Sequence, residues 1–597
     1  MDPLEYSRYA RQLVAARPEL REELERAKDA GWTRDAMQTF LRAQGAADEA
    51  TLHSALRKLR QRVFLRTMAR DLSGKASLDE VCGAMSVLAE VAVDAAIAFL
   101  GPRIAQTIGG RHQDLVVVGM GKLGGGELNV SSDVDLVFLY PDEGEGAAEK
   151  LEFFTRLGRR LIAALGERTE DGFVFRVDMR LRPWGDSGAL ATSFDALEEY
   201  FVTQGREWER YAWIKARVLG SQGESEALAA VVRPFVYRRY LDYGAFAAMR
   251  ELHAQIRAEV ARRELSDQIK LGPGGIREVE FIAQAFQLTR GGRDPVLQVR
   301  PTLAALTLLA QKKLLPEAAF RELSEAYVFL RRLEHRLQYL DDAQTHELPE
   351  QTEDRSLVAR AMGFDSWNVF RTVLDRYRTR VSSHFEQVFS VEEAPRHALA
   401  PLWMESEEIE PRLARLGFRD AAGTTARLAA VRSGARYRGL PQSSRSRFDA
   451  LIPRVIEESA ARDDPDAILA RSLDLLETVS RRAAYLALLD EHPAALARLA
   501  QLLGASSWAA EYLNRHPIVL DELLDARTLF ARPDWNAFAQ ELWRQLAARQ
   551  GEEERQMDWL REAHHAQVFR LLAQDLSGVL GVERLADDLS DLADVML

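Results

Sequence analysis

The spacing of apolar residues divides the chain into a long helical part, a short part with strands, and a second long helical part. Residues 1–110 carry apolar side chains every three or four positions among Arg, Glu and Ala, which favour helices. The pattern then changes, and three runs are short, β-branched or alternating, and bounded by Gly, Ser and Pro: DLVVVGMG (114–121), DVDLVFLY (133–140) and FVFRVDMRL (173–181). These runs predict strands.

Helical periodicity separates the second and third runs, in AAEKLEFFTRLGRRLIAALGE, and returns from about residue 194 to the end. The pattern therefore predicts an α+β fold, in which a small mixed sheet with helices packed against it is embedded in a mainly helical chain. Pro and small residues break the periodicity in VEEAPRHALAPLW (391–403), and residues 405–450 are polar and rich in arginine. We expect an N-terminal helical region (1–110), a catalytic core (111–260), a helical subdomain (261–395), a linker (396–450) and a helical bundle (451–597).

Length and composition narrow the class of protein. With 597 residues the chain is too long for one core. The balance of 79 basic against 91 acidic residues gives −12, which argues against nucleic acid as a general partner. Glu90 and Asp94 interrupt the most apolar stretch, which predicts a packed helix and not a membrane span, and the N-terminus does not resemble a secretion signal. The single cysteine, Cys82, excludes an internal disulfide and a cysteine metal cluster. We expect a cytoplasmic protein.

Two carboxylates stand inside the second predicted strand. Asp133 and Asp135 project from the same face, with Val134 turned inward, because successive strand residues face opposite sides. Two such carboxylates repel each other unless they are protonated or bind a cation. Oxygen ligands suit Mg²⁺, and Asp178 on the third predicted strand could complete a site of three carboxylates. Metals held there could clamp an in-line phosphoryl displacement.

The glycine-rich turn GKLGGGELNVSS precedes these carboxylates and would let the backbone approach phosphates closely. A DxD pair alone is more often a solvated strand end, and the turn matches neither the Walker nor the dinucleotide spacing. The compact order of strand, glycine turn, Ser-Ser-Asp-x-Asp strand and later strand carboxylate nevertheless favours a metal-dependent nucleotidyl-transfer site. The predicted phosphate-binding residues of the turn are Gly121, Lys122, Gly124, Gly125, Ser131 and Ser132.

Two further segments carry candidate anion-binding residues. Arg180 and Arg182 would alternate on the strand beside Asp178 and bind phosphates, unless they pair with the acidic cluster instead. The turn before a predicted helix in GPGGIREVEF (272–281) is a possible supporting or anion site, although a helix start with an internal ion pair explains it equally well. Its candidate residues are Gly274, Gly275, Arg277, Glu278 and Glu280.

The stretch GMGKLGGGELNVSSDVDLVF (119–138) resembles the glutamine synthetase adenylyltransferase/adenylyl-removing family. Other segments agree with that family over nearly the whole chain, namely FRVDMRLRPWGDSGALATS, GREWERYAWIKARVLG, IKLGPGGIREVEFIAQAFQLTRGG, LLDEHPAALARLAQL and HPIVLDELLD. The resemblance implies a nucleotidyltransferase fold in which Asp133, Asp135 and Asp178 hold Mg²⁺ at the nucleotide site.

The resemblance also implies a function. Proteins of this family have two catalytic domains around a helical regulatory region; the first removes AMP from a tyrosine of glutamine synthetase by phosphorolysis, with release of ADP, and the second attaches AMP from ATP. This chain has one glycine–DxD pattern, and ELNVSSD resembles the adenylyl-removing copy. Residues 451–597 resemble the regulatory region, which implies a response to the PII signalling protein, and the uncapped end LADDLSDLADVML leads us to expect a cut in a longer protein.

Two other functions remain as alternatives. The first is a nucleotidyltransferase acting on another protein or on RNA, such as a uridylyltransferase; the acidic balance disfavours RNA, and the sequence has no His-Asp dipeptide of the kind expected in a fused hydrolase domain. The second is a non-catalytic regulatory scaffold that binds glutamine synthetase and PII. The presence of all three aspartates argues against the scaffold.

Overall fold

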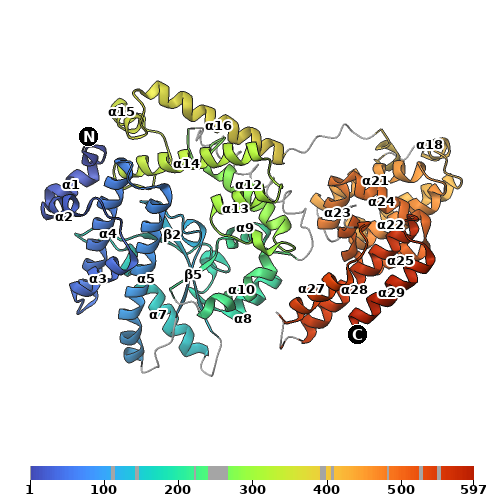
Figure 1. Cartoon of the computed structure of the whole chain (residues 1–597), viewed down its shortest axis with the longest axis horizontal. Helices are drawn as coiled ribbons and strands as arrows, with labels where there is room; N and C mark the ends of the chain where they lie inside the picture. Colours follow the sequence, from blue (N-terminus) through green and yellow to red (C-terminus); the bar gives the residue numbers. More distant parts are fainter. Residues whose placement is uncertain are drawn as a thin grey trace. The chain divides into compact units, whose positions relative to one another are not determined.

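The computed structural model describes residues 2–108, 115–141, 147–220, 223–238, 262, 267–389, 398–404, 409–440, 442–480, 483–523, 529–547, 551 and 553–597. The described residues form two compact units, one within residues 1–390 and the other within 391–597 (Figure 1). The first unit has two hydrophobic cores, one on each face of its sheet, and the second unit has one.

A mixed sheet of five strands lies in the first unit. The central strand β2 pairs antiparallel with β1 on one side, and β1 pairs antiparallel with β5. On its other side β2 pairs in parallel first with β3 and then, further along, with β4. The small mixed sheet predicted from the sequence is confirmed. Its strands are β1 (Val116–Gly119), β2 (Asp133–Tyr140), β3 (Arg176–Asp178), β4 (Ala191–Ser193) and β5 (Arg217–Leu219).

The second predicted strand has the bounds expected of it, but the third is much shorter than residues 173–181. The Asp178 carboxylate accepts a hydrogen bond from the backbone N–H of Arg180 at 2.8 Å, and this local turn ends β3 at Asp178. Arg180 and Arg182 therefore lie in a turn and not on the strand, contrary to the prediction.

The two faces of β2 pack against different groups of helices. Val134, Leu136 and Phe138 belong to the core formed with the N-terminal helices and α7, whereas Val137 and Leu139 belong to the core formed with later helices. Because strand residues alternate, Asp133 and Asp135 face the side of Val137 and Leu139. The prediction that Val134 turns inward is confirmed, since its side chain is 1% exposed.

The N-terminal helices cover the first face, as Figure 1 shows for α4, α5 and α7 beside the sheet. Helix α5 is long and apolar enough to cross a membrane, but 67% of its apolar window is buried inside the protein, as is typical of a core helix. The prediction of a packed helix is confirmed. The helices are α1 (Arg8–Ala16), α2 (Glu19–Ala27), α3 (Arg34–Gln44), α4 (Glu49–Leu72), α5 (Leu78–Ile108) and α7 (Ala147–Gly166).

Helices from the middle of the chain cover the second face and share one core with β1 and β2. The sheet and residues 267–389 are therefore packed as one unit, without a separate core on either side of the expected boundary at residue 260. The helices are α8 (Phe194–Thr203), α9 (Glu207–Trp213), α10 (Gly223–Val236), α12 (Ile276–Arg290), α13 (Thr302–Gln311), α14 (Glu317–Tyr339), α15 (Thr352–Ala361) and α16 (Trp367–Phe389).

The second unit is helical throughout its described residues, but it begins earlier than expected. Residues 398–404 and 409–440, assigned to a linker, form helices that contribute Leu402, Trp403 and Leu428 to the same core as the later helices. A few apolar residues at helical spacing suffice for this, even where most of the surface is polar. The helices are α17 (Pro401–Met404), α18 (Ile409–Arg415), α19 (Ala421–Ser433), α20 (Ala435–Arg438), α21 (Gln442–Ala460), α22 (Pro465–Val479), α23 (Ala483–Glu491), α24 (Pro493–Ala505), α25 (Ser507–Arg515), α27 (Trp535–Ala547), α28 (Glu553–Leu576) and α29 (Val582–Met596).

Candidate functional site

The glycine turn is held against the carboxylates of β2. The N–H of Met120 donates to the carbonyl of Asp135 at 2.9 Å, and the chain then turns through the short helix α6 (Gly121–Gly124). Gly121 has φ 51°, and a Cβ atom there would lie 2.9 Å from Oδ2 of Asp135. At Gly124 a Cβ atom would lie 1.9 Å from the carbonyl oxygen of Lys215. Glycine is thus required at both positions for the close approach of the turn to its neighbours.

Asp135 and Asp178 lie opposite each other in the parallel pairing of β2 with β3. Burial and the charge of Asp178 raise the pKa of the Asp135 carboxyl to about 6. Among the described residues, no side chain donates a hydrogen bond to the Asp135 carboxylate. The negative charge at the centre of the site is therefore poorly compensated by the protein itself.

The other two predicted carboxylates are each paired with an arginine. Asp133 accepts a hydrogen bond from Nε of Arg176 at 2.7 Å. Asp178 accepts one from Nε of Arg180 at 2.9 Å, and this contact holds the pKa of Asp178 below its ordinary value. Arg180 thus pairs with the acidic cluster, which was the alternative to a free phosphate ligand.

Arg182 does not face Asp178. Its guanidinium donates to the carbonyl of Met179 at 2.9 Å and to that of Gly188 at 3.4 Å, and so it closes the loop that follows β3. The predicted strand geometry was wrong here because the chain turns directly after Asp178.

The donor set of the site fits Mg²⁺. Asp135 and Asp178 offer neighbouring carboxylate oxygens, and a divalent cation would supply positive charge beside Asp135. Across the described ranges, no three acidic, histidine or cysteine side chains are already gathered as a metal site. Asp133 would join such a site only when its ion pair with Arg176 opens.

Two predicted phosphate ligands of the turn point elsewhere. Nζ of Lys122 donates to both carboxylate oxygens of Glu334, at 2.8 and 2.9 Å, and burial lowers the pKa of Lys122. Ser131 donates from its hydroxyl to the carbonyl of Asp342 at 3.0 Å and from its N–H to Gln338 at 3.1 Å. Both residues attach the turn to α14 and the loop after it, so neither presents a free donor to a phosphate.

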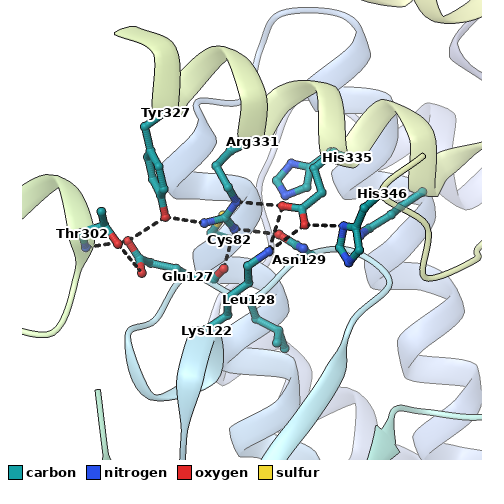
Figure 2. Close-up of polar contacts among 12 residues, drawn as sticks. Cys82, Lys122, Glu127, Leu128, Asn129, Thr302, Tyr327, Arg331, His335 and His346 are labelled. Carbon is teal, nitrogen blue, oxygen red and sulfur yellow. Dashed lines mark hydrogen bonds and ion pairs between the residues drawn. The ribbon is translucent and has the colours of Figure 1, made fainter. Parts of the chain in front are cut away.

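A buried polar network continues from this contact along α14 (Figure 2). The guanidinium of Arg331 donates to Asn129 at 2.7 Å and to Tyr327 at 2.7 Å, and Tyr327 in turn donates to Glu127 at 3.3 Å. Thr302 donates from its N–H to Glu127 at 2.7 Å. The network fixes the end of the glycine turn against α13 and α14.

Lys215 is a member of this network that the sequence did not reveal as a site residue. Its Nζ donates to Glu127 at 2.7 Å and lies 3.5 Å from Glu280. Burial opposes the ionisation of Glu280, but Lys215 and Arg277 outweigh it and lower its pKa to about 2. Lys215 and Glu127 are separated by 88 positions in the chain, and no local spacing links them.

The segment at 272–281 forms a helix start and not an open anion site. The N–H of Gly274 donates to the carboxylate of Glu278 at 3.0 Å, within the first turn of α12. A Cβ atom at Gly274 would lie 2.1 Å from the carbonyl oxygen of Arg378, so the backbone of α16 packs directly against this loop. The structure therefore agrees with the helix-start alternative, while Arg277 is buried close enough to Asp135 to interact with its charge.

Aromatic residues near the site divide into core and surface. Trp213 is 2% exposed and belongs to the core, whereas Trp208 is 41% exposed. Trp184, in the loop closed by Arg182, is half exposed and has φ 59°, and its ring lies 4.6 Å from that of Tyr200. A positive φ in a bulky residue is strained, and such residues collect at functional loops.

In the second unit His565 is half-buried and takes part in a small aromatic cluster. Its ring stacks on His516 at 3.7 Å, and its Nδ1 lies 2.9 Å from the hydroxyl of Tyr512.

Comparison with known proteins connects the site to a family. Residues 3–233 and 496–597 match the family model described as glutamate-ammonia ligase adenylyltransferase, and residues 250–389 match one described as PII-uridylyltransferase. The bifunctional glutamine synthetase adenylyltransferase/adenylyl-removing enzyme of Chromobacterium violaceum is 52% identical over 99% of this chain, which covers 68% of that relative. The enzyme of that name from Aromatoleum aromaticum is 54% identical over 99% of the chain, which covers 64% of it. The one from Ralstonia nicotianae is 49% identical over 100%, with 67% covered. The chain thus spans about two thirds of the length of these curated relatives.

Proposed function

The chain belongs to the glutamate-ammonia ligase adenylyltransferase family of nucleotidyltransferases, and on that premise we propose that it removes AMP from adenylylated glutamine synthetase. The relatives' name contains two activities, attachment and removal. We assign removal to this chain because its single glycine–DxD pattern has the ELNVSSD wording of the removing copy. The observation that carries the proposal is the register pairing of Asp135 with Asp178 beside the glycine turn.

The reaction that we propose is a phosphorolysis. An oxygen of hydrogen phosphate attacks the α-phosphorus of AMP linked to a tyrosine; a new P–O bond forms and the bond from phosphorus to the tyrosine oxygen breaks. The proton of the hydrogen phosphate passes to the departing tyrosine oxygen, and ADP is released. Attack and departure in line would place both oxygens along the carboxylate edge of the site.

The residues of the chain have separate roles in this scheme. Asp135 and Asp178 would hold Mg²⁺, with Asp133 as a third ligand once Arg176 releases it. The metal, when bound, neutralises charge that develops on the α-phosphate. Arg180 holds Asp178 ionised, and Gly121 lets the turn lie against Asp135 without a clash.

The cellular setting of this reaction follows from the family resemblance. We infer that the second unit is the regulatory region that responds to a PII signalling protein, which is supported by the match of residues 496–597 to the same family model. We also place the reaction in the cytoplasm, which is supported by the burial of the apolar helix α5.

The test is an incubation of the purified chain with adenylylated glutamine synthetase, Mg²⁺ and phosphate, with ADP as the measured product. We expect phosphate-dependent ADP that is lost in Asp178→Asn. ADP formation that survives this substitution would refute the carboxylate assignment. Stable binding of the synthetase without any ADP would favour the scaffold alternative.

A further inference from the structure

Lys270 lies in a loop that is fixed at both ends next to the candidate site. The N–H of Ile269 donates to the carbonyl of His346 at 2.8 Å, and the N–H of Ile276 donates back to Ile269 at 3.0 Å. The carbonyl of Lys270 itself accepts a hydrogen bond from the N–H of Arg277 at 3.1 Å. The backbone of Lys270 is therefore held in one place, although the residue belongs to no helix or strand.

The amino group of Lys270 differs from the other buried amines around the site. Lys122 has Glu334 as its partner and Lys215 has Glu127, both within 2.9 Å. In the part of the chain that the structure describes, no carboxylate or carbonyl lies within hydrogen-bond distance of the Lys270 amine. The residue is only partly buried, and an ammonium group without a partner adds nothing to the stability of the fold, so stability does not account for this lysine.

The described charged groups around Lys270 do not include a carboxylate that is free to act as its counter-ion. Burial and Arg277 lower its pKa, whereas Glu334 and Asp135 act in the opposite direction. Glu334 is already engaged with Lys122, and Asp135 lies beside a second carboxylate, that of Asp178. The amine therefore lies close enough to Asp135 to interact with its charge, without a counter-ion of its own among the described residues.

The arginines expected to bind phosphate are engaged as well. Arg180 pairs with Asp178, and Arg182 donates to carbonyls of its own loop. Among the cations that the structure places near Asp135, Lys270 is the one without a hydrogen-bonding partner. A phosphoryl group lying between this amine and a metal on the carboxylates would be contacted by positive charge from both sides.

We propose that Lys270 binds a phosphoryl oxyanion next to the Asp135–Asp178 pair. The oxyanion is either free orthophosphate or the α-phosphate of the tyrosine-linked AMP, since both present the same oxygens. Lys270 then contacts the reacting phosphate directly and counts as a binding residue of the reaction. This inference rests on the proposed function for its reaction but not for its ligand.

The test uses the whole chain with Lys270→Met and Lys270→Arg, and Lys312→Met as the matched control, because the Lys312 amine pairs with Asp294 away from the site. Thermal unfolding is first followed against increasing inorganic phosphate in the presence of Mg²⁺. We expect phosphate to stabilise the parent protein and the control alike. K270M should need at least about tenfold more phosphate for the same rise in unfolding temperature, and K270R should recover part of this loss. Without phosphate, K270M should unfold at a higher temperature than the parent, since an unpaired charge has been removed.

Initial rates of ADP formation then distinguish the two sources of the oxyanion. A raised KM for phosphate identifies orthophosphate, and a raised KM for adenylylated glutamine synthetase identifies the α-phosphate. Parent-like phosphate stabilisation and parent-like rates in K270M would overturn the proposal, as would a loss of stability in K270M without phosphate. If the parent protein formed no ADP but phosphate still stabilised it through Lys270, the proposed function would fail and the phosphate site would stand.

Discussion

Replacement of Asp135 by Asn should make the metal-free protein more stable while it abolishes activity. Burial and Asp178 raise the pKa of Asp135 from the ordinary 3.8 to about 6. At 1.36 kcal/mol for each unit, the ionised carboxylate reduces the free energy of unfolding by about 3 kcal/mol. Asn has nearly the same shape and carries no charge, so Asp135→Asn should recover most of that amount near pH 8.

The pH dependence fixes the sign of this effect. The folded protein binds the Asp135 proton more tightly than the unfolded chain does, so stability falls as pH rises from about 4 to about 6, and the penalty is complete above that range. The difference between the variant and the parent should therefore be small near pH 4, grow up to about pH 6 and then stay constant.

Thiol labelling measures this difference in the first unit alone. Cys82 is the single cysteine of the chain and lies buried in α5, so its reaction with a thiol reagent in denaturant reports unfolding of that unit. The comparison is made in EDTA, and added Mg²⁺ should stabilise the parent but not Asp135→Asn.

Asp133→Asn is the matched control, because it removes the ion pair with Arg176 and should bring no gain in stability. The reasoning would be refuted if Asp135→Asn were no more stable than the parent near pH 8. A gain of equal size at every pH would refute it too, since that gain would not come from a titrating carboxylate.

Three further predictions concern the turn and its surroundings. Gly121→Ala should lose activity in the ADP assay, because its Cβ would lie 2.9 Å from the Asp135 carboxylate. Gly126→Ala is the control, since φ is 69° there and nothing lies within 4 Å of the added Cβ. It should keep activity and cost only about 1 kcal/mol of backbone strain in denaturant unfolding. Glu334→Gln should destabilise the first unit by about 3–5 kcal/mol in the same unfolding measurement, because it leaves Lys122 buried without its counter-ion. Cys82 should resist alkylation in the folded protein near pH 8, since burial raises its pKa to about 11, and rapid labelling without denaturant would contradict the buried position.

Local patterns were sufficient for three of the five strands, but not for β4 and β5 or for the ends of the third predicted strand. The alternation in residues 133–140 gave β2 and the common face of Asp133 and Asp135, because strand periodicity reports which side chains share a core. The third strand was extended too far, since its end depends on a hydrogen bond from the Arg180 backbone to the Asp178 side chain. A side-chain turn of that kind leaves the apolar pattern unchanged, so the sequence gives no sign of it.

Residue types predicted which side chains gather near the site but not their direction. Lys122 in a glycine turn suggested a phosphate ligand, yet its amine reaches Glu334, 212 positions along the chain. Lys270 was part of a recognised segment without being a candidate, because its significance lies in the lack of a partner among the described residues. Pairing between charges far apart in sequence depends on tertiary packing, which periodicity and motif spacing do not report.

The ion pair between Lys122 and Glu334 positions the glycine turn, and this role is separate from its contribution to the free energy of unfolding. A buried pair loses much of its attraction to desolvation, so Lys122→Met together with Glu334→Gln should be far less destabilising than Glu334→Gln alone. The pair nevertheless joins the glycine turn to α14, and Gly121 in that turn lies against Asp135. Activity in the double variant should therefore remain low although stability returns, because the turn has lost its anchor. Full activity in the double variant would show that packing alone fixes the turn, and the polar network of α14 would then have no part in positioning the site.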